Sequence, residues 1–258
     1  MPELPDVEGW RRALAKELPG QRIKHVTVTD GGILRNATPQ SAVRRLVGHR
    51  FGEPGRVGKW LILPTDGPVL LIHSGMTGHP YFTSSSQARE AHERLTLTLD
   101  QGEFRYADLR KLRGLWIVDD VGVPVVIGSQ GPDALSIEWE SFANILQGKR
   151  GILKSALMDQ SVLAGLGNML SDEICWQARL SPIGAIANLD DADIRRLYLT
   201  MRRVLRTAVR HGRIPRLRSW LSSVRTVPDP ACPRCGTPLH RGRASGRTAL
   251  WCPSCQPR

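Results

Sequence analysis

The first residues of the chain place a nitrogen nucleophile beside a carboxylic acid. The stretch Met1–Gly9 has proline at position 2 and glutamate at position 3. A small second residue normally allows removal of the initiator methionine, which would leave the secondary amine of Pro2 at the terminus. A terminal amine is partly unprotonated near neutral pH, and it can attack an electrophilic carbon to form an iminium. Glu3 is close enough in sequence to donate or accept the proton that this chemistry needs.

The same residues also fit the start of an ordinary helix. Proline is common in the first helical turn, and acids at Glu3, Asp6 and Glu8 complement the helix dipole. So short a motif recurs by chance, so the other motifs of the chain must decide between the two interpretations.

Four cysteines near the C-terminus have the spacing of a metal site. They form two Cys-x-x-Cys pairs separated by a glycine-containing segment typical of a β-hairpin, and they are Cys232, Cys235, Cys252 and Cys255. This spacing favours a metal over a secreted disulfide framework. Four thiolates complete a closed tetrahedral site that leaves no position for catalysis. We therefore predict one structural Zn²⁺ ion.

The charge of the chain predicts a polyanionic partner. The 258 residues carry a formal charge of +12, and most of the basic side chains are arginines. The planar guanidinium matches phosphate oxygens, so nucleic acid is the favoured partner. No apolar run approaches the ~20 residues of a membrane helix, and no signal-peptide pattern begins the chain, so we expect neither membrane insertion nor export.

A glycine-containing turn joins two helical segments at Leu163–Leu170. Gly165 and Gly167 allow close approach of another backbone, and Asn168 falls where the second helix should begin. A helix N-terminus with free N–H groups and a carboxamide makes a phosphate site. The alternative is that Asn168 is an ordinary N-cap residue.

Short strand-like segments dominate the first half of the chain, and helical periodicity dominates the second half. An amphipathic helix is expected over residues 5–18 and another over 39–46. Strands are expected over residues 23–28, 50–57, 60–64, 69–73, 95–99, 104–107 and 115–118. Helices are expected over residues 137–147, 151–158, 167–178 and 190–211. An antiparallel β-sandwich or barrel is the natural packing for the strands.

These patterns predict an α+β chain of four parts. The first is an N-terminal antiparallel β-sandwich with a leading helix, residues 1–121. A linker, 122–135, precedes a helical DNA-binding domain, 136–225, and a zinc-finger hairpin, 226–258.

Three separated signals together resemble the family of bifunctional DNA glycosylases formed by formamidopyrimidine-DNA glycosylase (Fpg) and endonuclease VIII (Nei). They are the Pro2-Glu3 start, the Leu-x-Gly-x-Gly-Asn stretch that ends at Asn168, and the terminal four-cysteine finger. The resemblance covers essentially the whole chain. It implies a helix–two-turn–helix domain, damaged double-stranded DNA as the partner, and a bacterial-type cytoplasmic location on the nucleoid. A monomer is the default expectation.

The resemblance also implies a role for individual residues. Pro2 resembles the nucleophile that attacks C1′ of the damaged nucleotide, and Glu3 resembles the acid that assists opening of the sugar ring. Lys59 matches a lysine that contacts the lesion phosphate and supports elimination. The expected DNA contacts are His73, Met76, Arg110, Lys154, Asn168 and Arg247. Among these, Met76 would fill the gap left by a flipped base.

The chain departs from the family pattern in two loops. Where the family reads DPRRFG, this chain has residues 108–114, in which Leu112 replaces the aromatic residue and one residue is added. Residues 213–229, before the finger, are shorter than the segment that caps oxidised purines.

We therefore expect a glycosylase with lyase activity that excises oxidised purines and cleaves the strand by β,δ-elimination. Two alternatives within the family are a Nei-like enzyme for oxidised pyrimidines and a damaged-DNA-binding protein without glycosylase activity. A third alternative is a zinc-ribbon nucleic-acid module attached to an unrelated enzyme.

Overall fold

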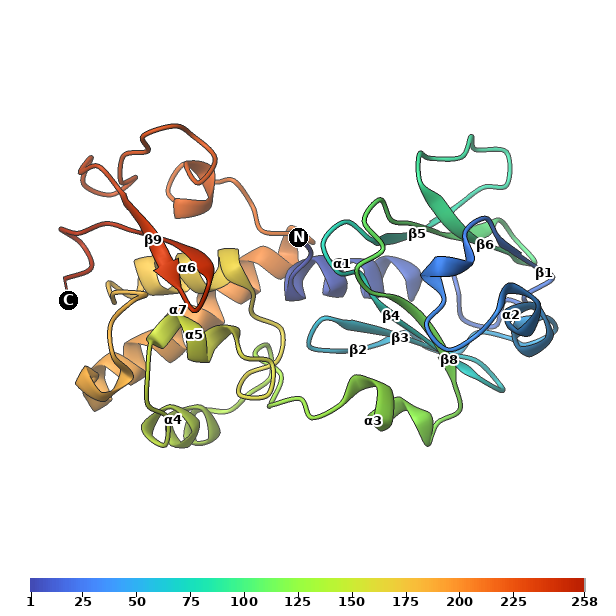
Figure 1. Ribbon diagram of the computed structural model, residues 1–258, viewed down its shortest axis with the longest axis horizontal. Helices are drawn as coiled ribbons and strands as arrows, with labels where there is room; N and C mark the ends of the chain where they lie inside the picture. The colour runs from blue at the N-terminus through green and yellow to red at the C-terminus, as the bar shows by residue number, and fades with distance from the viewer. Residues whose placement is uncertain (258) are drawn as a thin grey trace. The chain divides into compact units, whose positions relative to one another are not determined.

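Two four-stranded antiparallel sheets form the first half of the chain in the computed structural model, which describes residues 1–257 (Figure 1). One sheet has the order β1-β6-β7-β5, with β1 His25–Val28, β5 His79–Thr83, β6 Glu93–Thr98 and β7 Glu103–Ala107. The other has the order β2-β3-β4-β8, with β2 Gly55–Val57, β3 Trp60–Pro64, β4 Val69–His73 and β8 Gly114–Val118. Strand β5 is the one strand of these two sheets that was not expected from the sequence.

Side chains alternate between two cores along the central strands β3 and β4. Leu61, Leu63, Leu70 and Ile72 face a core that also holds Leu97 and Phe104 of the opposite sheet. The intervening residues of β3 and β4 face a second cluster, which the helix α3, Gly122–Ile127, covers. Because successive strand residues point to opposite faces, this alternation buries both faces of the sheet. The expected β-sandwich is confirmed.

The helices α1, Leu4–Leu14, and α2, Pro39–Leu46, belong to the same half of the chain. Thr38 caps α2, since its hydroxyl accepts a hydrogen bond from the backbone N–H of Ser41 at 3.2 Å. A short 3₁₀ helix spans Gly31–Ile33.

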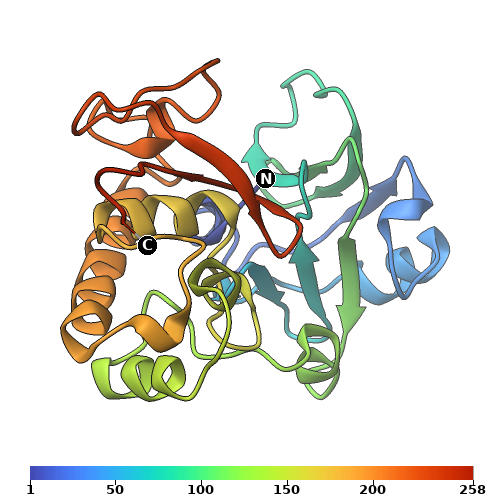
Figure 2. The ribbon, with the colours of Figure 1, turned by 60° about the vertical axis from the view of Figure 1, so that its left-hand side comes forward.

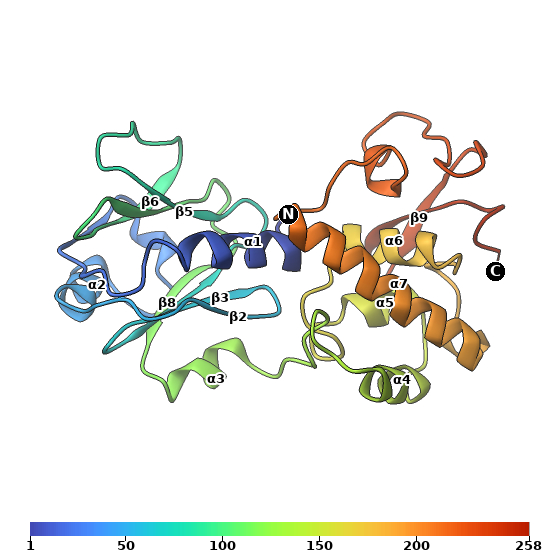
Figure 3. The same cartoon turned by 180° about the vertical axis from the view of Figure 1, so that it is seen from behind.

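The second half of the chain is helical and ends in a hairpin (Figure 3). Its helices are α4 Trp139–Gln147, α5 Leu153–Met158, α6 Asn168–Gln177 and α7 Asp191–Arg210, with 3₁₀ turns at Ile186–Asn188 and Leu221–Ser223. The hairpin strands are β9 His240–Ala244 and β10 Arg247–Trp251. Helix α6 is buried on nearly all sides and packs against α5, α7 and β10.

The chain divides into two compact units. Unit 1 comprises Met1–Pro2 and Asp6–Ser129, and unit 2 comprises Glu3–Pro5 together with residues 130–257. Leu4 accordingly lies in the core of unit 2, among residues of α4, α5, α6 and α7. Arg258, the last residue of the expected zinc-finger segment, lies outside the described residues.

One strand and one α-helix were not expected from the sequence. Strand β5 contains Pro80, which argues against a central strand, but β5 lies at the edge of its sheet, where proline is tolerated. Helix α3 contains a glycine, a proline and three valines, a composition with low helix propensity. Packing of Val123, Val126 and Ile127 against the outer face of the sheet supports this helix.

A buried carboxylate ties α1 to strand β2 within unit 1. The side chain of Glu8 accepts hydrogen bonds from Arg11 at 2.9 and 3.0 Å, from Arg12 at 2.8 Å and from Arg56 at 3.1 Å. Burial by itself would raise the pKa of Glu8, but these three arginines outweigh burial and hold the pKa at about 2.

We expect Glu8→Gln to lower the free energy of unfolding of unit 1 by about 2 kcal/mol at pH 7, because it removes charged hydrogen bonds from a buried site. The folded pKa of Glu8 lies below its ordinary value of 4.5, so its contribution is complete above that pH and disappears as the pH falls toward 2. Urea unfolding from pH 7 to pH 2 measures this difference. The exposed Glu17 is the matched control, and equal effects of Glu8→Gln and Glu17→Gln would contradict the assignment.

Candidate functional site

The carboxylate of Glu3 sits on the N-terminus of helix α6. Its two oxygens accept hydrogen bonds from the backbone N–H groups of Gly167 at 2.8 Å, Met169 at 2.8 Å and Leu170 at 3.2 Å. The first N–H groups of a helix have no partner inside the helix, and the positive end of its dipole attracts an anion. Glu3 is completely buried there, so the residue that follows Pro2 is fixed to the helical unit.

The two glycines of the turn before α6 make room for the N-terminal residues. A side chain at Gly167 would place its Cβ 2.4 Å from Cδ of Glu3, and one at Gly165 would place its Cβ 2.4 Å from Cδ1 of Leu4. Gly165 also has a φ of +110° and accepts a hydrogen bond from the N–H of Leu4 at 3.1 Å. The expected close approach of a backbone to this turn therefore involves the start of the same chain.

Asn168 begins α6, as expected, but it does not cap the helix. Gly167 is the N-cap residue and has no side chain that could cap the helix, so the Glu3 carboxylate supplies the acceptors instead. The Oδ1 atom of Asn168 is buried and has no hydrogen-bond partner among residues 1–257. The interpretation of Asn168 as an ordinary N-cap is therefore wrong, and its carboxamide has hydrogen-bonding capacity that this part of the protein leaves unused.

Lys59 occupies the tight turn between β2 and β3 in unit 1. Val57 pairs with Trp60, so Gly58 and Lys59 form a two-residue turn in which Gly58 has a φ of +55°. Arg56 connects this turn to α1, because it donates to the carbonyl of Gly58 at 2.9 Å as well as to Glu8. The position of Lys59 thus depends on the buried carboxylate of Glu8.

His73 ends β4 beside two cationic side chains. Burial, together with the charges of Arg113 and Lys59, lowers the pKa of His73 to about 4. Nδ1 of His73 accepts a hydrogen bond from the N–H of Gly75 at 3.1 Å, so its remaining proton is on Nε2. At neutral pH, His73 is an uncharged N–H donor, and the positive charge beside it is carried by Arg113 and Lys59.

Met76 and Arg110 lie on neighbouring loops that Asp108 ties together. The Asp108 carboxylate accepts from the Thr77 hydroxyl at 2.6 Å and from the N–H of Arg110 at 3.0 Å. Nη1 of Arg110 is 3.0 Å from the sulfur of Met76. Three apolar side chains stand exposed on these loops, namely Met76 at 37%, Leu109 at 55% and Leu112 at 52%. Exposed apolar side chains around an arginine are suited to stacking and pairing with a nucleobase.

The four C-terminal cysteines converge on one point. Their sulfur atoms all lie within 4.8 Å of one another, with separations of 3.4, 3.5 and 4.0 Å between three of the pairs. A tetrahedron with Zn–S bonds of about 2.3 Å has edges of about 3.8 Å. The indole N–H of Trp176 donates to Cys232 at 3.4 Å, and the N–H of Cys255 donates to Cys252 at 3.3 Å. The cluster fits a tetrahedral metal ion held by thiolates.

Lys154 is buried and joins the helices to the hairpin. Its Nζ donates to Asp172 of α6 at 2.6 Å and to the backbone carbonyl of Thr248 in β10. Asp172 also pairs with Arg225. Because Lys154 is 0% exposed, it presents no charge to solvent, and the phosphate contact expected for it has no support in this geometry. Its position instead supports the hairpin, one residue from Arg247.

Arg247 is exposed and follows the turn of the β9–β10 hairpin. Figure 2 shows this hairpin as the long pair of red strands. Arg247 pairs with Ala244 across a two-residue turn formed by Ser245 and Gly246, whose φ angles are 46° and 76°. Two successive positive φ angles are typical of a type I′ turn, which matches the twist of the strands. The hairpin therefore holds Arg247 on a rigid element.

Several supporting residues were not predicted from the sequence. Glu8 and Arg56 position Lys59, Asp108 positions Arg110, and Asp172 holds Lys154. Arg113 was noted only as part of an altered loop, although it shares the surroundings of His73. The contacts of Glu8 with Arg56, of Asp108 with Thr77 and of Asp172 with Lys154 join residues distant in sequence, so no local spacing reveals them.

No helix in residues 1–257 is long and apolar enough to cross a membrane.

Two family models match the chain. Residues 1–115 match the model described as the formamidopyrimidine-DNA glycosylase N-terminal domain, and residues 130–217 match that described as the formamidopyrimidine-DNA glycosylase H2TH domain.

Curated relatives and solved structures agree with these models. The chain is 33% identical to a formamidopyrimidine-DNA glycosylase of Symbiobacterium thermophilum, with 100% of this chain and 90% of the relative aligned. It is also 33% identical to one of Thermomicrobium roseum, with 100% and 99% aligned. Among solved structures, it is similar to Lactococcus lactis formamidopyrimidine-DNA glycosylase bound non-covalently to DNA that contains an abasic site. That match has a TM-score of 0.89, 26% identity and 100% coverage of both chains. The wild-type Lactococcus lactis protein bound to DNA with an N7-benzyl formamidopyrimidine lesion gives a TM-score of 0.88 and 28% identity, with the same coverage.

We expect Gly167→Ala to displace the Glu3 carboxylate from α6, because the added Cβ overlaps the carboxyl group. The loss of three hydrogen bonds to a buried charge should lower the free energy of unfolding of unit 2 by at least about 3 kcal/mol. Thermal unfolding and hydrogen exchange at Met169 and Leu170 measure this loss. Gly148→Ala is the control, since Gly148 has a helical φ of −79°. Unchanged amide protection in Gly167→Ala would show that Glu3 does not anchor α6.

Proposed function

The chain belongs to the formamidopyrimidine-DNA glycosylase family and is a DNA repair glycosylase, and from this premise we propose that it excises oxidised purines and then cleaves the strand. The preferred lesions are 8-oxoguanine and formamidopyrimidines. The names of the curated relatives support a purine preference over the Nei-like preference for oxidised pyrimidines.

The proposed nucleophile is the secondary amine of Pro2 after removal of Met1. Its lone pair attacks C1′ of the damaged nucleotide, and the bond from C1′ to the base breaks as the base leaves with a proton. Opening of the sugar ring gives an iminium between Pro2 and C1′, which acts as an electron sink. Loss of a proton from C2′ then expels the 3′ phosphate by β-elimination, and δ-elimination expels the 5′ phosphate.

The observation that carries this proposal is the fixed position of Glu3. Three backbone N–H groups at the start of α6 hold its carboxylate, so Glu3, the residue bonded to Pro2, has a fixed position. A carboxyl group held next to the nucleophile is suited to protonate the sugar oxygen during ring opening and to return that proton later. Asn168 begins the same helix, which supports a phosphate contact beside the acid.

The remaining site residues are proposed to hold and deform the DNA. Lys59, His73 and Arg247 would contact phosphates, and phosphate contacts fix the register of the duplex. Met76, Arg110 and Leu112 would fill the space of the flipped nucleotide and pair with the orphaned base, which offsets the few kcal/mol lost by unstacking. The exposure of Met76 and Leu112 and the contact between Met76 and Arg110 support this role.

We also propose that the metal is Zn²⁺ with a structural function only. Cys232, Cys235, Cys252 and Cys255 would be its ligands, and four thiolates leave it no open coordination position. The ion would stiffen the short module that carries Arg247, and the residues of the reaction itself lie elsewhere in the sequence. We propose, in addition, that the chain divides into four parts at residues 121, 135 and 225. It would act as a monomer and be located in the cytoplasm, on the chromosome.

Blocking the amine of Pro2 should abolish the chemistry and leave DNA binding intact. A chain with an uncleaved N-terminal extension carries an amide at Pro2, so borohydride should trap no covalent adduct with an abasic duplex. Pro2→Gly should reduce trapping and strand cleavage at least 100-fold, because it replaces the constrained secondary amine. Denaturing gels with an end-labelled duplex measure both quantities.

The binding affinity of the blocked chain for an uncleavable abasic duplex is the control, and it should match the wild type. Unchanged strand cleavage by the blocked chain would favour an unrelated catalytic centre. Absence of any adduct with the wild-type chain would favour a lesion-binding protein without glycosylase activity.

Leu112 should limit how strongly the protein holds the orphaned base. Stacking of an aromatic side chain on a base is worth roughly 1–3 kcal/mol, so Leu112→Phe should tighten binding of a lesion duplex about tenfold or more. A panel of duplexes, each with one oxidised purine or one oxidised pyrimidine, measures affinity and excision. Faster excision of the pyrimidines would overturn the purine preference.

Leu109→Phe is the matched control, because Leu109 lies in the same loop with similar exposure. Equal gains from the two substitutions would mean that added aromatic area in the loop, and not a stacking position at residue 112, increases affinity.

A further inference from the structure

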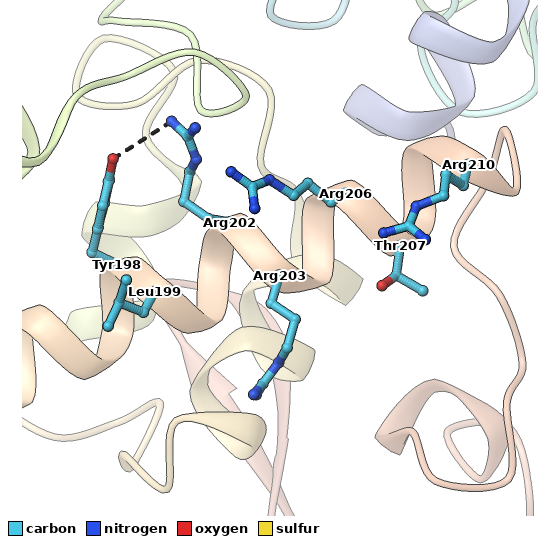
Figure 4. Close-up of a pocket in the computed structure, with 7 residues that line it drawn as sticks. All are labelled: Tyr198, Leu199, Arg202, Arg203, Arg206, Thr207 and Arg210. Atoms are coloured by element: carbon cyan, nitrogen blue, oxygen red, sulfur yellow. Dashed lines mark hydrogen bonds between the residues drawn. The ribbon is translucent and has the colours of Figure 1, made fainter.

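The outer face of helix α7 carries a row of arginines that the proposed reaction does not use. Arg202, Arg203, Arg206 and Arg210 line a hollow of about 290 Å³ together with Tyr198, Leu199 and Thr207 (Figure 4). No acidic residue lines this hollow. All seven residues belong to α7, so the hollow is a feature of one helix face within unit 2.

Two of these arginines have no partner among the residues that the structure describes. Arg206 and Arg210 are exposed and form no hydrogen bond or ion pair with any of residues 1–257. Arg202 is held in place, since it donates to the carbonyl of Ile137 at 3.1 Å and lies 3.5 Å from the hydroxyl of Tyr198. In Figure 4 the side chains of Arg202 and Arg206 extend on the same side of the helix.

A purely solvated helix face does not account for this row. Like charges four residues apart destabilise a helix, and the row contains two such pairs, Arg202 with Arg206 and Arg206 with Arg210. At the start of the same helix, Arg196 pairs with Asp193, so repulsion there is relieved. The helix dipole favours cations only in the last turn, which explains Arg210 but not Arg202.

The spacing of the row matches a regular line of anions. Residues four apart on a helix are separated by about 6 Å along its axis, so the three arginines span about 12 Å, over which one strand of duplex DNA carries three to four phosphates. Every basic residue of α7 is an arginine, the side chain suited to phosphate. Leu199 is the one exposed apolar side chain among the lining residues, which is too little apolar area for insertion into a lipid surface.

This face and the hairpin lie on different sides of unit 2. Helix α6 packs against α7 on one side and against β10 on another. Figure 1 shows the hairpin in front of α6, and Figure 3, turned by 180°, shows α7 in front of it. A duplex on the outer face of α7 therefore does not compete with a contact at Arg247.

We propose that the arginine face of α7, formed by Arg202, Arg206 and Arg210, is a second, sequence-independent binding surface for the phosphate backbone of duplex DNA. It goes beyond the proposed glycosylase reaction, because it binds undamaged DNA while the lesion duplex is held elsewhere. Such a surface lets one molecule contact two DNA segments and pass between them during a search.

The test measures binding of a second duplex after the first site is filled. Protein saturated with an unlabelled duplex that contains an uncleavable abasic analogue is titrated with a fluorescent undamaged duplex at several salt concentrations. The wild type should bind the second duplex. Arg206→Gln with Arg210→Gln should weaken that binding at least tenfold and reduce the slope of log affinity against log salt by about 1.8, the value for two phosphate contacts.

Two further variants make the result specific. Arg44→Gln with Arg45→Gln removes the same charge from the last turn of α2 and should leave the second duplex bound as in the wild type. Arg206→Lys with Arg210→Lys keeps the charge and should retain most of the slope. Excision from a short lesion duplex should be unchanged in the Arg206→Gln, Arg210→Gln protein, and circular dichroism verifies its fold.

Four outcomes would overturn the proposal. They are no binding of a second duplex by the wild type, equal losses in the α7 and α2 variants, an equal loss of lesion-duplex affinity in the α7 variant, and displacement of the second duplex by polyglutamate as readily as by DNA. The last outcome would indicate an acidic protein partner. None of them depends on chemistry at Pro2, since the DNA is not cleaved in this assay.

Discussion

The hydrogen bonds between Glu3 and the start of α6 are the constraint on which the proposed site depends. They connect a residue at the beginning of the chain to backbone groups more than 160 positions later. A helix N-terminus needs acceptors, and a buried carboxylate needs donors, so each satisfies the other. These hydrogen bonds also restrict the position of Pro2, because Pro2 is bonded to the ordered residue Glu3. A terminal amine would otherwise belong to the least ordered part of a protein.

The same constraint explains the glycines that precede α6. From sequence alone, Gly165 and Gly167 were interpreted as residues that allow close approach of another backbone. In the structure they accommodate Leu4 and Glu3, and any side chain in their place would overlap these residues. The interpretation identified the need for space correctly but not the group that fills it. That group lies far away in sequence, and a local motif carries no information about so distant a contact.

Elements with strong local signals were predictable, and elements stabilised by tertiary packing were not. Strands β3 and β4 match their expected residues because alternating burial and flanking turns both mark them. Helix α3 and strand β5 depend on a neighbouring sheet, which overrides the unfavourable local composition of Pro80 and of residues 122–127. The four cysteines were identified because metal geometry constrains their spacing directly. Lys154 was expected to contact phosphate, and the sequence did not reveal its burial, which depends on Asp172 and the hairpin.

The charges buried in α6 show why the finger does not rely on metal ligands alone for its placement. Burial raises the pKa of Asp172 and lowers that of Lys154, which reflects the cost of removing both charges from water. Replacement of such a pair by apolar residues is often neutral or stabilising, so stability alone does not explain it. Asp172 also accepts from the N–H of Leu250 in β10, and its neighbour Glu173 accepts from the N–H of Ser222. These directional bonds fix the hairpin and the segment before it in one register on α6, whereas apolar contacts alone would allow several. A phosphate contact at Arg247 requires that single register, so we interpret the buried charges as determinants of position.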